Sequence, residues 1–430
     1  MPFIADFHIH SKFSRASSSK TNIPNLALSA ALKGIKVLGT GDFTHPGWLE
    51  EIKRNLEEAE PGFLRLRLPV ISSLEKQIPF LKEKLQEIRF VFTTEVSTIF
   101  TRAGKIKKIH LLIFAPDLKT VEKINIKLGW IGNLKSDGRP TFSIEAKEIL
   151  KTVLDISEEC LIVCAHIWTP WFSLFGSRSG FDSIEECFGE ESKYIYALET
   201  GLSSDPPMNW RVSSLDKFTL ISCSDAHSPE NLGREANVFN SSFDYFSIIK
   251  AIKEKDRQKF LYTIEFFPEE GKYHFDGHRL CQIRLSPKER KKYGGICPIC
   301  QKPVTVGVLS RVEELADRED GFVPSNAIPY KSLVPLKEII SQSSALNGKK
   351  ISIEEEYKRL IAYLGSEFEI LIEKNIEEIS KISPIVAEGV KKIREGKIKL
   401  IPGFDGEYGK VIIWEKEEFE RRIPSQKQLF

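Results

Sequence analysis

Short apolar runs alternate with helical patterns through roughly the first 260 residues of the chain. Strands are predicted where runs are short, apolar and rich in β-branched or aromatic residues, at 2–6, 35–41, 90–94, 109–115, 160–165, 194–198 and 218–224. Helices are predicted where apolar residues recur with helical spacing, at 24–34, 75–89, 144–156 and 245–254. This alternation indicates a parallel β/α architecture.

Side chains that bind metals stand at or near the ends of these strands. They are His8, His10, Asp42, His45, Glu95, His110, His166, Asp225 and His227. In parallel β/α barrels the carboxyl ends of the strands carry the chemistry, so we expect these residues on one rim. One histidine at a strand end is usually structural, but the set predicts a cluster of divalent ions such as Zn²⁺, Mn²⁺ or Mg²⁺. The expected catalytic set is His8, His10, Glu95, Asp225 and His227.

These motifs resemble those of the PHP superfamily, named after polymerases and histidinol phosphatases. The resemblance is carried by Asp6-Phe7-His8-Ile9-His10, Asp42, Glu95, His110, His166 and Ser224-Asp225-Ala226-His227. It implies a distorted (β/α)7 barrel that hydrolyses phosphoesters with a cluster of usually three metals. The chain departs from the family where an acidic ligand is usual, at Ser14-Arg15-Ala16, and where Asp-His is common, at Asp42-Phe43-Thr44-His45. We expect Arg15 to hold a phosphate, since guanidinium matches phosphate oxygens bidentately.

An aromatic loop follows His166 directly. It contains Trp168, Trp171, Phe172, Phe175 and Arg178. Two readings stay open, namely a hydrophobic loop packed against the barrel and a pocket wall that stacks on a base. Glu199 is a candidate polar reader of that base, and Arg234 could reach a substrate phosphate or pair with a nearby carboxylate.

Two short pairs of metal-binding residues lie further along the chain. His278 and Cys281 form one, and Cys297 and Cys300 form the other. Pairs with two intervening residues fit a tetrahedral structural zinc site. His274 is the alternative to His278, although its larger gap from Cys281 makes it the less regular partner.

The remaining chain has mainly helical patterns, at 333–341, 353–364 and 376–395, the last broken near Pro384, and a short strand at 411–414. We therefore predict a catalytic barrel over residues 1–262, a zinc-binding domain over 263–330 and a mainly helical domain that could contact DNA over 331–430. The last residues, Gln426 to Phe430, resemble the start of the peptide motif that binds sliding clamps.

Composition changes this picture little. The net charge of +2 neither demands nor excludes a nucleic-acid partner. No apolar run approaches the roughly 20 residues that cross a bilayer, and the N-terminus lacks a signal pattern. We expect a cytoplasmic protein without a membrane partner.

Across essentially its whole length the chain is similar to the endonuclease Q family. The resemblance rests on the barrel motifs, the zinc pairs, 308–318 and Pro402-Gly403-Phe404-Asp405-Gly406. It implies a DNA repair endonuclease that cuts on the 5′ side of deaminated bases, such as hypoxanthine, uracil and xanthine, and at abasic sites, with a sliding clamp as a partner. Two alternatives are a phosphatase acting on a small phosphomonoester and a non-catalytic adaptor for DNA or a clamp.

Overall fold

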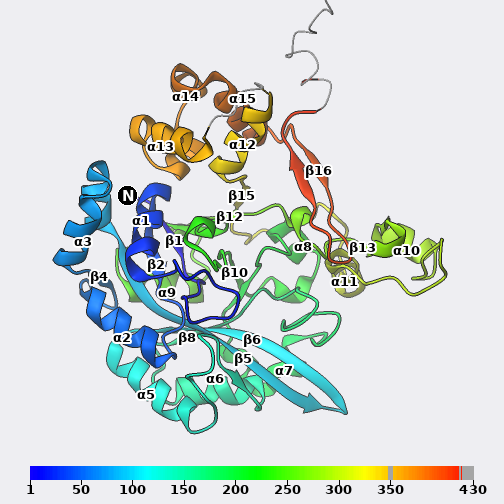
Figure 1. The fold of residues 1–430 in the computed structure, drawn as a ribbon. Helices are drawn as coiled ribbons and strands as arrows, with labels where there is room; N and C mark the ends of the chain where they lie inside the picture. Colours follow the sequence, from blue (N-terminus) through cyan, green and yellow to red (C-terminus); the bar gives the residue numbers. More distant parts are fainter. Residues whose placement is uncertain (347–351, 416–417, 419–430) are drawn as a thin grey trace, which may run out of the picture.

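A strongly curled sheet forms the centre of the computed structural model, which describes residues 1–346, 352–415 and 418 (Figure 1). Its strands follow the order β10-β9-β8-β6-β5-β2-β1-β11-β12-β15. They are β1 (Phe3–Asp6), β2 (Ile35–Gly39), β5 (Arg89–Arg102), β6 (Lys105–Ala115), β8 (Leu161–Cys164), β9 (Ala197–Glu199), β10 (Thr219–Ile221), β11 (Ala236–Phe239), β12 (Phe260–Glu265) and β15 (Tyr330–Ser332), with β3 (Leu56–Glu58), β4 (Leu64–Leu66) and β7 (Thr141–Phe142) beside them. The mixed α/β class that the sequence predicts is confirmed.

Strand β6 departs from the parallel arrangement. β1, β2 and β5 run parallel, as do β8, β9 and β10, but β6 is antiparallel to both of its neighbours. It forms a long hairpin with β5 that projects from the sheet (Figure 1). Because β6 runs backwards, His110 directly precedes the part of the strand that pairs with β8 and so lies at the rim where the other strands end. It pairs there with Ser97, two residues beyond Glu95.

The curled sheet closes on itself with few backbone contacts. Past the ends of β1 and β10, Ile9 and Ala226 form an isolated parallel bridge. Further inside the barrel, side-chain hydrogen bonds of Asn237 replace hydrogen bonds between the two backbones. Asn237 accepts from Ser222 N at 2.9 Å and donates to Ser222 O at 2.7 Å and to Ala5 O at 3.4 Å. We call this closure between β1 and β10 the seam.

Helices cover the outside of the sheet, and α9 lies across its far end. The helices of this part are α1 (Ile23–Lys33), α2 (Pro46–Asn55), α3 (Leu68–Glu75), α4 (Lys82–Glu87), α5 (Leu118–Gly129), α6 (Ala146–Leu154), α7 (Ile184–Phe188), α8 (Pro206–Trp210) and α9 (Tyr245–Lys253). Helix α1 shows why they form: Asn22 accepts from Asn25 N at the start, and Gly34 ends the helix at φ 88°. The helix predicted at 75–89 is shorter in the structure: α3 already ends at Glu75, and α4 begins only at Lys82, after Pro79.

The inner face of the sheet is apolar at one end and polar at the other. Val91, Leu112 and Tyr245 belong to a buried cluster that fills the interior and is separate from the larger core between sheet and helices. Glu95 follows Val91 at even spacing along β5, so it faces the same side at the rim. The apolar interior thus supports a polar rim.

The remaining elements lie beyond the barrel. They are β13 (Asp276–His278), β14 (Ile283–Leu285), α10 (Pro287–Lys292), α11 (Val308–Leu315), α12 (Leu336–Leu346), α13 (Ile353–Leu364), α14 (Ile376–Ile382), α15 (Pro384–Arg394), β16 (Lys399–Ile401) and β17 (Lys410–Ile412). The short helical turns of the chain are η1 (Pro79–Leu81), η2 (Gly189–Tyr194), η3 (Ser213–Leu215), η4 (Pro229–Asn231), η5 (Pro268–Glu270), η6 (Arg279–Cys281) and the π-type η7 (Glu369–Glu373). Among the described residues, no helix combines the length and hydropathy needed to span a membrane.

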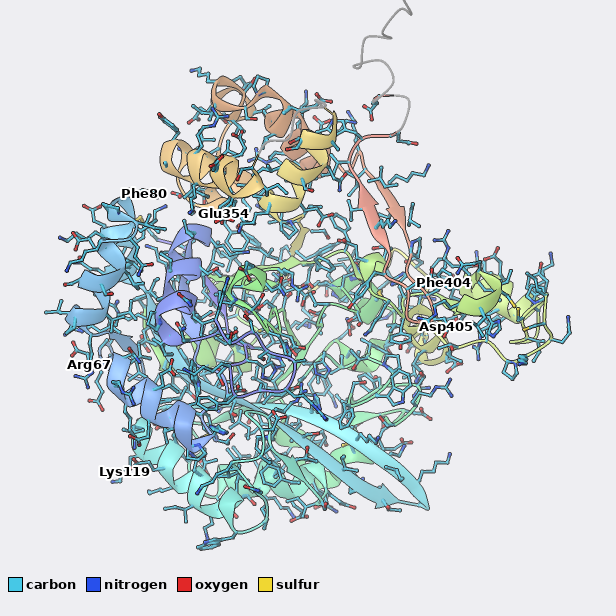
Figure 2. The ribbon with its side chains drawn as sticks, viewed as in Figure 1. Arg67, Phe80, Lys119, Glu354, Phe404 and Asp405 are labelled. Carbon is cyan, nitrogen blue, oxygen red and sulfur yellow. The ribbon has the colours of Figure 1, made fainter. Side chains whose placement is uncertain are left out.

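The loop between β16 and β17 reaches the zinc-binding segment. Phe404 and Asp405 lie in this loop, close to the zinc-binding segment (Figure 2). Phe404 packs over Gly277, and Asp405 accepts hydrogen bonds from Arg279 N and Thr305 Oγ1, both at 2.6 Å. At the other boundary, β12 and β15 pair in parallel, so the barrel sheet continues across both residue 262 and residue 330. The division into three domains stays a prediction.

Two buried glutamates lie close together where β11 begins and β12 ends. Glu235 precedes β11, Glu265 ends β12, and both are fully buried. Burial, with Asp205 nearby, raises the pKa of Glu265 to about 8, although Thr200 Oγ1 donates to it at 3.2 Å. Burial and Glu265 also raise the pKa of Glu235 well above its ordinary value.

We predict that Glu265→Gln removes a pH-dependent loss of stability. A carboxyl whose pKa is raised on folding favours the native state below its unfolded pKa, and that stability is lost as pH rises toward about 8. The melting temperature of the variant relative to wild type should therefore increase between pH 5 and pH 8.5, measured by calorimetry at constant ionic strength. The exposed Glu254→Gln is the control, and a constant difference for Glu265→Gln would contradict the assignment.

Candidate active site

His8, His10 and Glu95 form the first ligand group at the rim, and Asp225 lies beside it. Nε2 of His8 lies 3.6 Å from Glu95 Oε2, and Nε2 of His10 lies 3.3 Å from the same oxygen. Asp225 Oδ1 lies 3.0 Å from His10 Nε2. In the described part of the chain, both Nε2 atoms and Asp225 Oδ1 are buried without a hydrogen bond of good geometry. Converging buried lone pairs of this kind are satisfied by a metal ion.

The second ligand group uses the other oxygen of Glu95. Glu95 Oε1 lies 2.6 Å from His110 Nδ1 and 3.0 Å from His166 Nε2. The three ligand atoms lie within 4.8 Å of one another. Glu95 therefore faces one group with each oxygen, which is the arrangement of a carboxylate that bridges two ions.

His227 belongs to a third group with His10 and Asp225. Its Nδ1 lies 2.8 Å from the backbone oxygen of Asp225, and its ring centroid lies 4.4 Å from that of His10. The Nδ1 atom of His10 is engaged by Asp42, which leaves one nitrogen for a metal. His10 can therefore serve the first or the third group, but not both at once.

Hydrogen bonds from behind orient the histidines. Glu199 accepts from His8 Nδ1 at 2.9 Å and from the backbone N–H of His166 at 2.8 Å. Asp42 faces His10 Nδ1 at 3.0 Å. Carboxylates in this position fix the tautomer of a metal-binding histidine, so that Nε2 is left free for the ion.

Three predicted site residues take positions that differ from those expected: Asp42 and His45 as metal ligands, and Glu199 as a reader of the base. Asp42 is outside the ligand groups, because its carboxylate also accepts from Ser11 and Ser14 at 2.7 Å each. Glu199 is fully buried beneath His8, where it cannot read a base. His45 is likewise outside the ligand groups, since its ring stacks on Phe13 with centroids 4.2 Å apart.

The backbone at the rim takes left-handed conformations. Asp42, His166 and Asp225 have φ values of 47°, 30° and 46°. Non-glycine residues rarely adopt such angles, and the conformations persist where the surrounding structure holds them. Next to Asp42, a Cβ on Gly41 would lie 2.2 Å from Ile9 O, so glycine is required there.

The carboxylates at the centre stay ionised. Burial alone would raise the pKa of Glu95, but the positive charges of Arg139 and His8 outweigh it and hold that pKa well below its usual value. Burial likewise opposes ionisation of Asp225, and the histidines lower its pKa. Burial lowers the pKa of His110 to about 4 despite Glu95, which keeps this imidazole neutral, as a metal ligand must be.

The aromatic loop divides between core and surface. Trp168 and Phe175 are buried and pack on each other with centroids 4.9 Å apart, and Trp168 Nε1 donates to Asn209 at 2.8 Å. These two cannot stack on a base. Trp171 is 42% exposed, and the ring of Phe172 lies 4.8 Å from that of His110. The packed loop describes Trp168 and Phe175, whereas base stacking by Trp171 and Phe172 stays a prediction.

The predicted arginines differ in their surroundings. Arg15 and Arg178 are exposed, and the backbone N–H of Arg15 lies 3.3 Å from Asp137 Oδ1. Arg234 is partly buried over the ring of Phe266, and burial lowers its pKa although Asp225 lies nearby. Among the described residues its Nε has no hydrogen-bond partner.

Sequence reasoning missed Arg139. Its Nη1 donates to Glu95 Oε2 at 2.9 Å, which places a guanidinium at the centre of the ligand groups. The residue lies in a loop between α5 and β7, without periodicity or a nearby ligand motif. The one available signal is the turn-forming Asp137-Gly138-Arg139-Pro140 itself.

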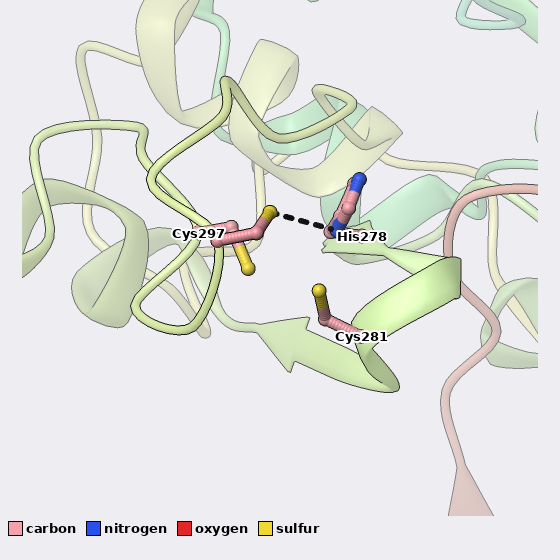
Figure 3. A group of neighbouring side chains, drawn as sticks. His278, Cys281 and Cys297 are labelled. Carbon is pink, nitrogen blue, oxygen red and sulfur yellow. Dashed lines mark hydrogen bonds between the residues drawn. The ribbon is translucent and has the colours of Figure 1, made fainter.

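The zinc pairs come together as one group. His278, Cys281, Cys297 and Cys300 place their ligand atoms within 4.8 Å of one another, and Cys300 Sγ lies 3.5 Å from His278 Nδ1 (Figure 3). His278 ends β13 and Cys281 ends η6, just before β14, which pairs antiparallel with β13. His274 instead lies in the core, stacked on Phe275. Of the two histidines that the sequence left open, His278 is therefore the one beside the cysteines.

Comparisons of sequence find relatives that cover up to 95% of the chain. A family described as the MJ0043 C-terminal domain matches residues 335–397. The uncharacterized protein MJ0043 of Methanocaldococcus jannaschii is 37% identical over 265 residues, which are 58% of this chain and 32% of that protein. The chain thus spans about a third of that relative. The uncharacterized protein YqxK of Bacillus subtilis is 27% identical over 95% of this chain and 98% of its own length.

Two solved structures superpose over nearly the full length. The lesion-specific endonuclease PfuEndoQ from Pyrococcus furiosus has 30% identity and a TM-score of 0.82, with 98% of each chain covered. An endonuclease Q in complex with a 27-mer duplex substrate, with an abasic lesion at the active site, has 29% identity and a TM-score of 0.81 over 99% of this chain and 100% of that one.

We predict that Glu199→Gln weakens metal binding in the barrel. Glutamine keeps the shape but removes the charge that orients His8, and changes of this kind typically cost about 10–100-fold in metal affinity. Titration of the metal-depleted protein with Mn²⁺ or Zn²⁺ measures the effect, with Glu254→Gln as control. Unchanged affinity would show that His8 does not depend on Glu199.

We predict that Cys297→Ser removes one zinc ion per chain and leaves the barrel ions in place. The serine hydroxyl is a poor zinc ligand, whereas the barrel groups share no residue with the cysteine site. Elemental analysis after dialysis gives the count, and Cys160→Ser, at a buried cysteine far along the chain from the pairs, is the control. Equal zinc in wild type and Cys297→Ser would exclude a structural ion at this group.

Proposed function

The chain belongs to the endonuclease Q family, and we propose that it is a DNA repair endonuclease that hydrolyses the phosphodiester on the 5′ side of deaminated bases and abasic sites. One observation carries the proposal: Glu95 faces two separate ligand groups with its two oxygens, at the rim of the barrel. Such a centre is suited to phosphodiester hydrolysis.

The ligands assigned to the barrel ions are His8, His10, Glu95, Asp225 and His227 together with His110 and His166. When bound, divalent ions supply Lewis acidity and favour ionisation of water near neutral pH. Zn²⁺ and Mn²⁺ suit this mixed set of nitrogen and oxygen donors, whereas Mg²⁺ prefers oxygen ligands. Zn²⁺ is the ion we propose for the group around Cys297.

The protein's own groups bind and orient the substrate. Arg234 lies near Asp225 with an unpaired Nε, and Arg15 and Arg178 are exposed, so all three can contact phosphates. Trp171 and Phe172 are the aromatic residues of the loop that remain accessible to an unstacked base. A deaminated mispair or an abasic site opens at lower cost than a sound pair, which favours lesions.

Both alternative functions fit less well. A phosphatase for a small phosphomonoester gives no role to the zinc group or to the helices after residue 330, yet the similar endonucleases extend over these parts as well. A non-catalytic adaptor gives no reason for converging buried ligand atoms.

The sliding-clamp contact, which the sequence suggests for residues 426–430, is a separate proposal and lies outside the described residues. Location in the cytoplasm also stays a prediction.

The decisive test is cleavage of an end-labelled duplex that carries one deoxyinosine, with Mn²⁺ or Mg²⁺. We expect a nick directly 5′ of the lesion, and a loss of cleavage in His8→Ala and Asp225→Ala, because the first removes a donor from the group with Glu95 and the second a donor from the group with His227. Duplexes with an abasic site and without damage are run in parallel. An intact strand under all metals, or equal cutting of the undamaged duplex, would disprove the proposal.

A further inference from the structure

Arg139 puts a positive charge where the protein is built to bind cations. Its Nη1 lies 2.9 Å from Glu95 Oε2, the oxygen that also faces His8 and His10. Like charges this close repel one another, so the guanidinium disfavours ions in the first ligand group. An arrangement of this kind is favourable when an anion lies between the guanidinium and the ions and attracts both.

The loop that carries Arg139 is fixed on both sides. Gly138 N donates to Phe13 O at 3.0 Å, and Ser97 N donates to Pro140 O at 2.9 Å, where β7 begins to pair with β5. Within the loop, Arg139 N donates to Asp137 Oδ1 at 3.0 Å. The position of the guanidinium is therefore set by the fold.

Gly138 makes this approach possible. A Cβ there would lie 2.2 Å from Asp42 Oδ2 and 2.3 Å from Ser14 Oγ. The loop thus passes directly over the hydrogen bonds that hold Asp42, and it delivers Arg139 to the centre from the solvent side. Its side chain remains 23% exposed, whereas Glu95 is fully buried.

The guanidinium retains free donors. Among the described residues it makes one side-chain hydrogen bond, to Glu95, although an arginine has five N–H groups in a planar fork. The others are available to a ligand that approaches the rim. A phosphate oxygen matches this fork in both charge and geometry.

We propose that Arg139 binds a non-bridging oxygen of the scissile phosphate and that Glu95 positions its guanidinium for this contact. The inference rests on the proposed function, because it assumes that a phosphodiester is the substrate. As the water oxygen bonds to phosphorus and the P–O3′ bond breaks, with a proton passing to the 3′ oxygen, Arg139 holds the negative charge on the phosphoryl oxygens. Removing one such preorganised donor typically costs about 10²–10³-fold in rate.

The competing role is structural, in which Arg139 merely holds Glu95 in place for the metals. The two roles predict opposite changes in metal affinity. If Arg139 binds phosphate, its removal takes away a repelling charge, and the barrel ions bind as tightly as before or more tightly. If it holds Glu95, its removal weakens the ions and the activity together.

The experiment compares wild type with Arg139→Ala and Arg139→Lys, and uses Arg65→Ala as a matched control, since the exposed Arg65 of β4 pairs with Glu57 of β3. Mn²⁺ titration reports metal affinity, and single-turnover cleavage of the deoxyinosine duplex reports the rate. We expect Arg139→Ala to keep or tighten metal binding and to cleave about 10²-fold more slowly or worse, with partial recovery in Arg139→Lys. Loss of barrel ions in Arg139→Ala, or a rate within about threefold of wild type, would overturn the proposal.

A second measurement separates this inference from the proposed function. Inorganic phosphate, the probe, is titrated into the metal-loaded proteins and its affinity is measured by calorimetry. We expect weaker phosphate binding in Arg139→Ala than in wild type and Arg65→Ala, whether or not any duplex is cut. Equal phosphate affinity in all three proteins would count against Arg139 even if the enzyme cleaves lesions.

Discussion

The rim depends on one buried carboxylate, that of Glu95. Each of its oxygens faces a different ligand group, and Arg139 contacts one of them from the solvent side. A fully buried carboxylate needs compensating positive charge, because burial otherwise favours its neutral form. Histidines and the arginine supply part of that charge, and divalent ions would supply the rest. Residues on or directly after three strands, β1, β5 and β6, therefore meet around a single side chain.

The hairpin of β5 and β6 shows how the fold brings this about. A parallel strand in the place of β6 would carry His110 at the other end of its ladder with β8, since the residue directly precedes Leu111, where that ladder begins. Because β6 is antiparallel, His110 lies opposite Ser97 at the rim and meets Glu95. His166 reaches the same oxygen from the end of β8 through a left-handed backbone.

The sequence allowed much of this to be predicted, and the failures have physical causes. The convergence of His8, His10, Glu95 and Asp225 follows from strand ends that share one rim, which local pattern reveals. Strand direction does not show in a local pattern, so the reversal of β6 could not be predicted. A carboxylate at a strand end also looks the same whether it faces a metal or supports a histidine, which is why Asp42 and Glu199 were assigned to other roles.

Loops set the other limit. Trp168 and Trp171 are three residues apart in one aromatic loop, yet one is buried and the other exposed, because the loop turns in a way that no periodicity describes. Arg139 lies in a loop whose path depends on Gly138 passing over Asp42, a contact between segments nearly a hundred residues apart in the sequence.

The seam has a consequence for how the protein holds together. His8 and His10 extend from β1 on one side of it, while Asp225 and His227 extend from β10 on the other, and few backbone hydrogen bonds join the two sides. An ion bound by His10 and Asp225 would link the two sides of the seam directly. Metal binding would then be coupled to the stability of the fold, and depletion of metal would loosen the seam before the rest of the sheet.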